Sequence, residues 1–209
     1  FQSFGPDTTK SSSSLGKSIV EYREGIYVGY RYYTTRAYED DTFNYDDYVQ
    51  YSFGEGYSYT TFEKHISEYE FDEETNKLSV QVAVKNTGDV AGKEVVELYL
   101  TAPYTKGGIE KAYVELAGYA KTNELKPNET YYARIDIDLE DLASWDTNNG
   151  NYVLEKGTYV LSLRDDCNTL TKVTGSNKNT ITFEYKNDVR FLSGDGGTNY
   201  KNQFSDCEY

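Results

Sequence analysis

The side chains that could do chemistry in this chain are mainly carboxylates. The sequence has 35 Asp and Glu residues but a single histidine, His65. One histidine cannot build a histidine-based metal cluster, so that class of site is excluded. A carboxylate pair working as acid and base is therefore the chemistry to look for. Glu24 and Glu55 are the first candidates because the glycines beside them let a backbone approach a ligand, although carboxylates that are merely exposed or cap the backbone would show the same pattern.

Two acidic runs and two cysteines are the other candidates for a site. Glu39-Asp-Asp41 and Asp46-Asp47 could offer oxygen ligands to calcium, but their spacing lacks the loop signature of an EF-hand, and such runs are usually solvated loops. Cys167 and Cys207 could form a disulfide in an oxidising compartment or could stay as two thiols. Because the chain has no Cys-x-x-Cys pair, we expect neither a metal site nor a cofactor.

The overall charge excludes some classes of partner. The formal net charge is −14, whereas nucleic acids and anionic membrane surfaces are bound by clustered Lys and Arg. No apolar run approaches the ~20 residues that span a bilayer, so we expect neither a nucleic-acid partner nor a membrane span. The sequence contains no methionine, which suggests a processed product or a part of a longer polypeptide. An extracellular or cell-surface location and a homo-oligomer are further hypotheses.

Alternating apolar residues predict an antiparallel β-sandwich between residues 62 and 186. In several short segments every second residue is apolar, which is the period of a strand with one face in a core. Turn residues separate about seven such segments, a spacing typical of a sandwich. Tyrosine occurs 23 times and would lie on half-buried sheet surfaces or form a platform for sugars. The expected core residues are Leu78, Val80, Val82, Val84, Val96, Leu98, Leu100, Tyr131, Ala133, Ile135, Ile137, Tyr159, Leu161, Leu163, Ile181, Phe183 and Tyr185.

The segments that flank the sandwich have different patterns. Residues 1–61 begin with a Ser- and Thr-rich stretch, and the segment Ile19–Thr34 is expected to form a strand with bulges at its glycines. An acidic, tyrosine-containing loop is expected at residues 35–50. A break in the alternation predicts a single helical turn over Leu139–Trp145. Residues 187–209 are rich in glycine and lack periodicity, which favours a linker or strap.

Four segments of this chain carry a family resemblance: Glu24–Tyr33, Tyr51–Phe62, Val84–Val96 and Leu125–Thr130. They resemble glycoside hydrolase family three, the β-glucosidase-like enzymes. They occur in the family's order and at similar spacing, and the match covers roughly residues 19 to 186. Together they are more specific than any one motif. They resemble the end of the family's α/β-sandwich domain and the whole of its fibronectin type III-like domain.

The resemblance implies an all-β fold with an N-terminal extension. Residues 62–186 would form a fibronectin type III-like, immunoglobulin-like sandwich, and residues 1–61 would be the C-terminal portion of an α/β-sandwich domain. The parent polypeptide would hydrolyse terminal β-glycosides such as β-glucosides with retention. In the family, one catalytic carboxylate lies on a barrel and the other on a loop of the α/β-sandwich domain, and neither motif occurs here. We therefore expect no catalytic residue in this chain, and we expect the barrel and the rest of the α/β-sandwich domain as its partners.

Three departures from the family pattern leave a second hypothesis open. Ser52, Glu55 and Tyr57 stand where the family segment has Pro, Tyr and Leu. Glu55 should cost stability there unless its carboxylate finds a partner or faces water. Such changes would suit a non-catalytic structural or adhesive module, a scaffold or filament subunit derived from the same domains. A carbohydrate-binding module would instead need a row of exposed aromatic side chains on one sheet face.

Asn128-Glu-Thr130 is a formal N-glycosylation sequon in a predicted turn. Such a sequence accepts a glycan only on a secreted chain and at an exposed site. We therefore expect Asn128 to be exposed, and its modification is a hypothesis that depends on secretion.

Overall fold

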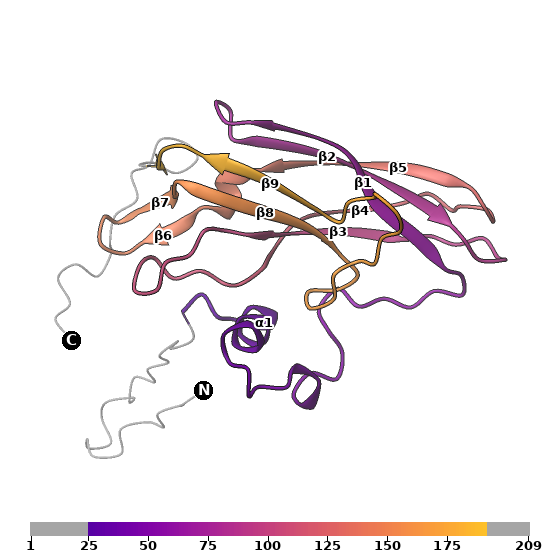
Figure 1. The fold of residues 1–209 in the computed structure, drawn as a ribbon, viewed down its shortest axis with the longest axis horizontal. Helices are drawn as coiled ribbons and strands as arrows, with labels where there is room; N and C mark the ends of the chain where they lie inside the picture. The colour runs from indigo at the N-terminus through magenta and orange to yellow at the C-terminus, as the bar shows by residue number, and fades with distance from the viewer. Residues whose placement is uncertain (1–24, 192–209) are drawn as a thin grey trace, which may run out of the picture.

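Two antiparallel sheets face each other across the main core of the chain (Figure 1). This computed structural model describes residues 25–191. One sheet has the strand order β1-β2-β5 and the other the order β4-β3-β8-β9, while a small third sheet has the order β10-β7-β6. The elements are α1 (Tyr30–Glu39), η1 (Tyr45–Asp47), β1 (Phe62–Asp72), β2 (Lys77–Asn86), β3 (Val95–Thr101), β4 (Glu115–Lys121), β5 (Thr130–Asp138), η2 (Leu139–Leu142), β6 (Ser144–Asp146), β7 (Asn151–Leu154), β8 (Gly157–Arg164), β9 (Thr180–Tyr185) and β10 (Val189–Phe191).

The main core confirms the alternating pattern of the sequence. All the expected core residues are buried in a single cluster between the two large sheets, except Tyr131, which is partly buried and packs against that cluster. The side chains of Val82 in β2 and Leu161 in β8 are both 0% exposed. Burying these apolar faces against each other is what stabilises the two layers, at roughly 25 cal/mol per Å² removed from water. The all-β sandwich predicted from the sequence is therefore confirmed.

A buried asparagine ties together three loops at one end of the sandwich. The side-chain carbonyl of Asn86 accepts hydrogen bonds from the Thr60 hydroxyl at 2.7 Å and the Gly88 N–H at 3.0 Å. Its amide donates to the backbone carbonyls of Val90 and Leu125, both at 2.8 Å. Because Asn86 is 0% exposed, these four bonds offset the cost of burying its amide.

The strand predicted over Ile19–Thr34 is wrong for the described residues. Gly25 and Gly29 adopt positive φ angles of 59° and 62°, and α1 begins directly after Gly29. A left-handed residue ends an extended segment and is accessible to glycine at low cost. Tyrosine favours strands, but that preference is weak and packing overrides it: Tyr30 and Thr34, one helical turn apart, both turn toward the sandwich.

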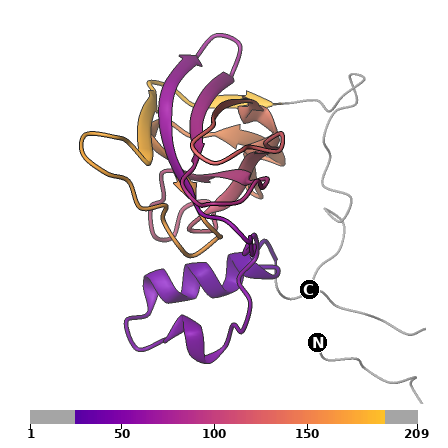
Figure 2. The ribbon, with the colours of Figure 1, turned by 90° about the vertical axis from the view of Figure 1, so that its right-hand side faces the viewer.

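The predicted loop at residues 35–50 is likewise partly helical. Its first residues complete α1, and η1 adds a short turn in which Tyr45 is buried. Figure 2 shows these two helical elements as a layer of their own beside the sandwich. The helical segment, residues 25–61, therefore lies against the sandwich instead of extending one of its sheets.

The described part of the predicted C-terminal linker also contains a strand. β10 pairs antiparallel with β7 through the register Arg190↔Val153. The Arg190 guanidinium donates to the Asp146 carboxylate at 2.8 Å and to the Asn151 side-chain carbonyl at 3.0 Å. Residues 189–191 of the predicted linker or strap are thus paired with the sandwich, and a strand of three residues is too short to show a periodic pattern in the sequence. The linker or strap over residues 187–209 stays a prediction. The helical turn predicted over Leu139–Trp145 is confirmed by η2, after which β6 begins.

Candidate docking surface

The two carboxylates considered for acid and base chemistry cannot be compared as a pair. Glu24 lies outside the described residues, whereas Glu55 is exposed in the loop that precedes β1. Within residues 25–191, no three His, Cys, Asp or Glu side chains gather closely enough to hold a metal ion. The acidic runs lie at the end of α1 and in η1. No helix in this range is long and apolar enough to cross a membrane.

The three departures from the family pattern contact one another. The Ser52 backbone N–H donates to the Glu55 carboxylate at 3.1 Å, and the Tyr57 hydroxyl donates to the other oxygen of the same group. A proline at position 52 would have no N–H to donate. Glu55 both faces water and finds partners, so it meets both conditions under which it was expected to cost no stability. These substitutions form one hydrogen-bonded turn.

Cys167 is fully buried beneath the helical segment. Its thiol lies 3.4 Å from the Tyr45 hydroxyl, and its backbone N–H donates to the Phe53 carbonyl at 2.9 Å. Burial raises the pKa of the Cys167 thiol, so the neutral form predominates at neutral pH. Cys207 lies outside the described residues, and the Cys167–Cys207 disulfide stays a prediction.

Asn128 lies in an exposed turn before β5, with a φ of 66°. Asparagine tolerates this left-handed conformation better than most residues do. Its backbone N–H donates to the Asn86 carbonyl at 2.8 Å. The exposure of Asn128 is as expected from the sequence, and glycosylation of this side chain stays a prediction.

Aromatic rings fasten the helical segment to the outer face of the β4-β3-β8-β9 sheet. The Tyr30 ring stacks on Phe53 with centroids 4.5 Å apart and meets Tyr99 of β3 edge-on at 6.2 Å. Tyr99 points away from the main core, yet it is 0% exposed because it belongs to a second buried cluster with Val114 and Cys167. Both faces of β3 are therefore buried, one in the main core and one beneath the helical segment.

Polar contacts reinforce this attachment. The Tyr30 hydroxyl accepts a hydrogen bond from the Leu116 N–H at 2.9 Å, and the Thr35 hydroxyl accepts one from the Tyr113 N–H, also at 2.9 Å. The Arg31 guanidinium lies 3.0 Å from the carboxylate of Glu115 in β4. The backbone N–H groups of Leu116 and Tyr113 thus both have acceptors on α1, so the helix fixes the path of the chain as it enters β4.

A charged cleft of about 510 Å³ lies where the loop before β1 crosses the sandwich. The Lys64 ammonium is 2.7 Å from the Glu94 carboxylate and 2.9 Å from that of Asp165. Burial by itself lowers the pKa of Lys64, but these two carboxylates outweigh it and the pKa is raised. Burial also raises the pKa of Glu97, whose carboxylate accepts a hydrogen bond from the Tyr99 hydroxyl at 2.8 Å. These charges are matched within the fold, which indicates a structural role.

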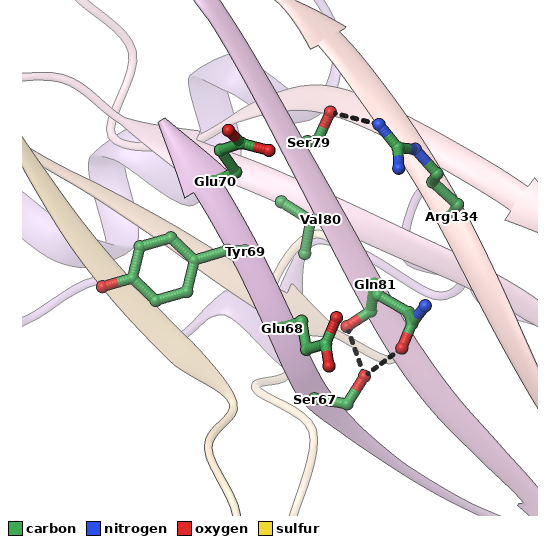
Figure 3. A pocket seen from close by; sticks show the side chains of 8 residues that line it. All are labelled: Ser67, Glu68, Tyr69, Glu70, Ser79, Val80, Gln81 and Arg134. Carbon is green, nitrogen blue, oxygen red and sulfur yellow. Dashed lines mark hydrogen bonds between the residues drawn. The ribbon is translucent and has the colours of Figure 1, made fainter. Parts of the chain in front are cut away.

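The outer face of the β1-β2-β5 sheet has a different character. A hollow of about 550 Å³ opens there, and Figure 3 shows the Ser67 hydroxyl bonded to Gln81 and the Arg134 guanidinium bonded to Ser79. Tyr69 is the one aromatic side chain that lines this hollow, and it points away from Arg134. This hollow therefore lacks the row of aromatic side chains that a carbohydrate-binding face of this kind would need.

Exposed aromatic side chains concentrate on the helical segment instead. Of the sixteen large hydrophobic side chains that are exposed among residues 25–191, eight lie between residues 28 and 59. Tyr57 is 85% exposed and Tyr59 is 103% exposed. Exposed apolar side chains that gather on one segment are a feature of interaction sites, whereas singly scattered ones are normal. We call seven of these side chains the docking surface: Val28, Tyr32, Tyr48, Tyr51, Phe53, Tyr57 and Tyr59.

Comparison with known proteins identifies the sandwich. A family model described as a fibronectin type III-like domain matches residues 94–167. A curated relative, the probable β-glucosidase K of Emericella nidulans, is 41% identical over 140 residues, which cover 67% of this chain and 15% of the relative. The chain spans 15% to 19% of the length of the curated relatives it matches.

Solved structures match a larger share of the chain. β-Glucosidase 3B from Thermotoga neapolitana, in complex with α-D-glucose, is 36% identical with a TM-score of 0.66, covering 81% of this chain and 21% of that protein. The β-glucosidase from Kluyveromyces marxianus, in complex with glucose, is 31% identical with a TM-score of 0.68, covering 85% of this chain and 19% of that protein. Sequence motifs, family model and fold agree, and the chain belongs to glycoside hydrolase family three, of which it is the fibronectin type III-like region.

Proposed function

We propose that this chain braces the catalytic domains of a family-three β-glucosidase. The parent polypeptide hydrolyses terminal β-glycosides such as β-glucosides with retention, which requires two carboxylates ~5–5.5 Å apart. Those groups come from a barrel and from the rest of an α/β-sandwich domain in the same polypeptide. The present chain contributes a rigid sandwich and buried interface area to that assembly.

The docking surface is the observation that carries this proposal. Its aromatic side chains lie on the segment that resembles the end of an α/β-sandwich domain, and the inner side of that segment is fastened to the sandwich by Tyr30 and Thr35. A segment held on one side and apolar on the other is suited to join two bodies. The remainder of the α/β-sandwich domain is the occupant we propose for its outer side.

The first test is made on the polypeptide isolated from its source. We expect an intact mass tens of kilodaltons above the 23.9 kDa of this chain, and hydrolysis of an aryl β-glucoside. The chain on its own should show no turnover. A source polypeptide of about the same mass as this chain, or turnover by the chain alone, would contradict the proposal.

A second test addresses bracing directly. Replacing Tyr51 and Tyr59 with serine should lower the thermal midpoint of the source polypeptide and leave that of the isolated chain unchanged, because these rings are exposed only when the partner is absent. Tyr132→Ser is the matched control, since Tyr132 is 58% exposed but lies on β5. Equal effects of the two sets of substitutions would argue against a docking role.

The alternative function is a structural or adhesive module built from the same domains. The hydrogen-bonded turn of Ser52, Glu55 and Tyr57 favours it, because these residues depart together from the family pattern. In that case the docking surface would bind a second copy of the chain. Concentration-dependent assembly of the source polypeptide without glycoside turnover would support this function over the first.

An extracellular or cell-surface location is part of the proposal. The exposed Asn128 sequon supports it, because such a site can accept a glycan in a secretory pathway. A glycan on Asn128, or recovery of the polypeptide from the medium or the cell surface, is the expected result. Recovery of the polypeptide from the cytosol, with Asn128 unmodified, would contradict an extracellular or cell-surface location.

A further inference from the structure

A second cleft, apart from the docking surface, opens between α1 and the connection from β3 to β4. Its volume is about 420 Å³, within the range of small-molecule sites. Four tyrosine rings line it, together with polar side chains that include Glu39 and Lys111. The side chains used in the argument are Tyr27, Tyr38, Glu39, Tyr104, Lys111 and Tyr113.

One wall of the cleft is a stacked aromatic pair. The Tyr38 ring lies parallel to that of Tyr113, with centroids 4.0 Å apart and an interplanar angle of 10°. Tyr113 packs in turn against the buried cluster around Tyr99, so the pair is held by the fold. Tyr38 is 60% exposed although Tyr113 covers one face of its ring, so part of the Tyr38 ring is accessible to a ligand.

Two of the other lining tyrosines, Tyr27 and Tyr104, are held by Glu110, which lies next to the cleft. The carboxylate of Glu110 accepts hydrogen bonds from the hydroxyls of Tyr27 and Tyr104, the latter at 3.5 Å. Burial and the nearby carboxylates of Glu110 and Glu39 raise the pKa of Tyr104, which keeps its hydroxyl protonated. Both tyrosines thus present fixed polar edges to the cleft.

The charge of the cleft is negative. Lys111 is buried, and its ammonium is paired with the Glu155 carboxylate, so it does not neutralise Glu39, which lines the cleft, or Glu110 beside it. The carboxylates of Glu39 and Glu110 therefore set the local field. The negative field repels anionic ligands. The carboxylate oxygens can accept hydrogen bonds from the hydroxyl groups of a neutral ligand.

We propose that this cleft is an auxiliary subsite for a neutral saccharide made of β-linked glucose units. The flat, apolar face of a sugar ring with equatorial hydroxyls packs on the accessible part of the Tyr38 ring. Its hydroxyls donate to the Glu39 carboxylate and exchange hydrogen bonds with the Tyr104 hydroxyl. The choice of β-linked glucose rests on the proposed function of the parent enzyme, whereas the stacking surface and the carboxylates are features of this chain alone.

The test is a titration of the chain with cellobiose, followed by the chemical shifts of its backbone amides. The expected shifts cluster around Tyr38, Tyr104 and Ala112, and glucuronic acid should give smaller ones. Loss of the stacking ring in Tyr38→Ala should weaken cellobiose binding about tenfold. Tyr132→Ala is the matched control, because Tyr132 is 58% exposed, close to the 60% of Tyr38, but lies on β5.

A second variant tests the subsite even if Tyr38→Ala does not fold. Glu39→Gln changes an exposed carboxylate at the last residue of α1, where a negative charge opposes the helix dipole, so it should not destabilise the helix. It should weaken cellobiose binding while leaving the thermal midpoint in place. An absence of shifts up to the solubility limit of cellobiose would overturn the proposal, as would wild-type binding by both variants.

The two proposals can fail separately. Aryl β-glucoside turnover by the source polypeptide, combined with no cellobiose binding to this chain, would reject the subsite and leave the bracing function standing. Cellobiose binding that depends on Tyr38, combined with no turnover, would support the subsite and reject the enzyme as the parent.

Discussion

The Tyr30 ring meets the Tyr99 ring edge-on, with centroids 6.2 Å apart. This contact joins the helical segment to a strand whose opposite face lies in the main core. Tyr99 would otherwise expose a large ring on the outer side of β3. With Tyr30 in place it is fully buried, and its hydroxyl donates to Glu97. The helix and the sandwich are therefore coupled by apolar burial as well as by chain connectivity.

Removing the Tyr30 ring should loosen the helical segment. Tyr30→Ala deletes the stack on Phe53, the edge contact with Tyr99 and the acceptor for the Leu116 N–H, at a cost of about 1–3 kcal/mol. Limited proteolysis should then cut within residues 40–60 faster than in the wild type. Tyr32→Ala, on the exposed side of α1, is the control and should leave the cleavage rate unchanged. Similar rates for both variants would show that Tyr30 is no anchor.

The loop before β1 offers a pair of glycines for a backbone test. Gly54 has a φ of 88°, and a Cβ there would collide with the Glu97 carboxylate. Gly54→Ala should destabilise the chain by about 1–2 kcal/mol, because a left-handed conformation is strained for any residue with a Cβ. Gly56→Ala should be nearly neutral, since no atom lies within 4 Å of a Cβ at that position. The measurement is the thermal midpoint of each variant, and a lower midpoint for Gly56→Ala would contradict the argument.

Two adjacent residues of β2 test the strand's orientation. Val82 is 0% exposed in the core, so Val82→Asp would bury an unpaired charge and should cost about 4 kcal/mol or more. Gln81 lies on the outer face, where its carbonyl groups accept hydrogen bonds from the Ser67 hydroxyl. Gln81→Asp should change stability by less than about 0.5 kcal/mol. Urea denaturation midpoints compare the two, and equal losses would refute this orientation.

Asp146 should make stability depend on pH in the acid range. The Arg190 guanidinium and the Asn149 amide lower the pKa of Asp146 from 3.8 to about 2 in the folded state. Since the depressed pKa belongs to the native state, the stabilisation is complete above pH about 4 and is lost as the pH falls toward about 2.

The measurement is the urea midpoint of wild type and variants across this pH window. Asp146→Asn should be less stable than the wild type at neutral pH and should show a shallower fall on acidification. Arg190→Gln should shift in the same direction, because it removes the principal cause of the lowered pKa. If the urea midpoint of the wild type has the same pH dependence as that of both variants, the Asp146–Arg190 contact contributes nothing measurable to stability.

The sandwich could be predicted from the sequence because each strand buries one face, so its apolar residues alternate. Val80 and Val82 illustrate the rule. Tyr99 shows where it fails: its position in β3 marks it as an outward residue, and only the packing of α1 buries it. The helix itself could not be predicted, since its tyrosine-rich sequence favours strands and its burial depends on a sheet far along the chain.

The candidate site was predictable only in part. The three departures from the family pattern were visible as separate substitutions, but their shared hydrogen bonds required the geometry of the turn. The second cleft combines Tyr38 of α1 with Tyr104 and Tyr113 from the β3–β4 connection, which no local pattern links. Long-range contacts of this kind arise from tertiary packing, so periodicity in one segment cannot reveal them.

Asn86 has a consequence for how this end of the molecule opens. Its amide binds the end of the helical segment at Thr60, the β2–β3 turn at Gly88 and Val90, and the loop before β5 at Leu125. None of these loops can separate from the others without leaving part of a buried amide unpaired. Their backbone amides should therefore exchange with solvent deuterium as a single cooperative unit. Asn86 therefore couples the end of the helical segment to two loops of the sandwich, in addition to the contacts that Tyr30 and Thr35 make from α1.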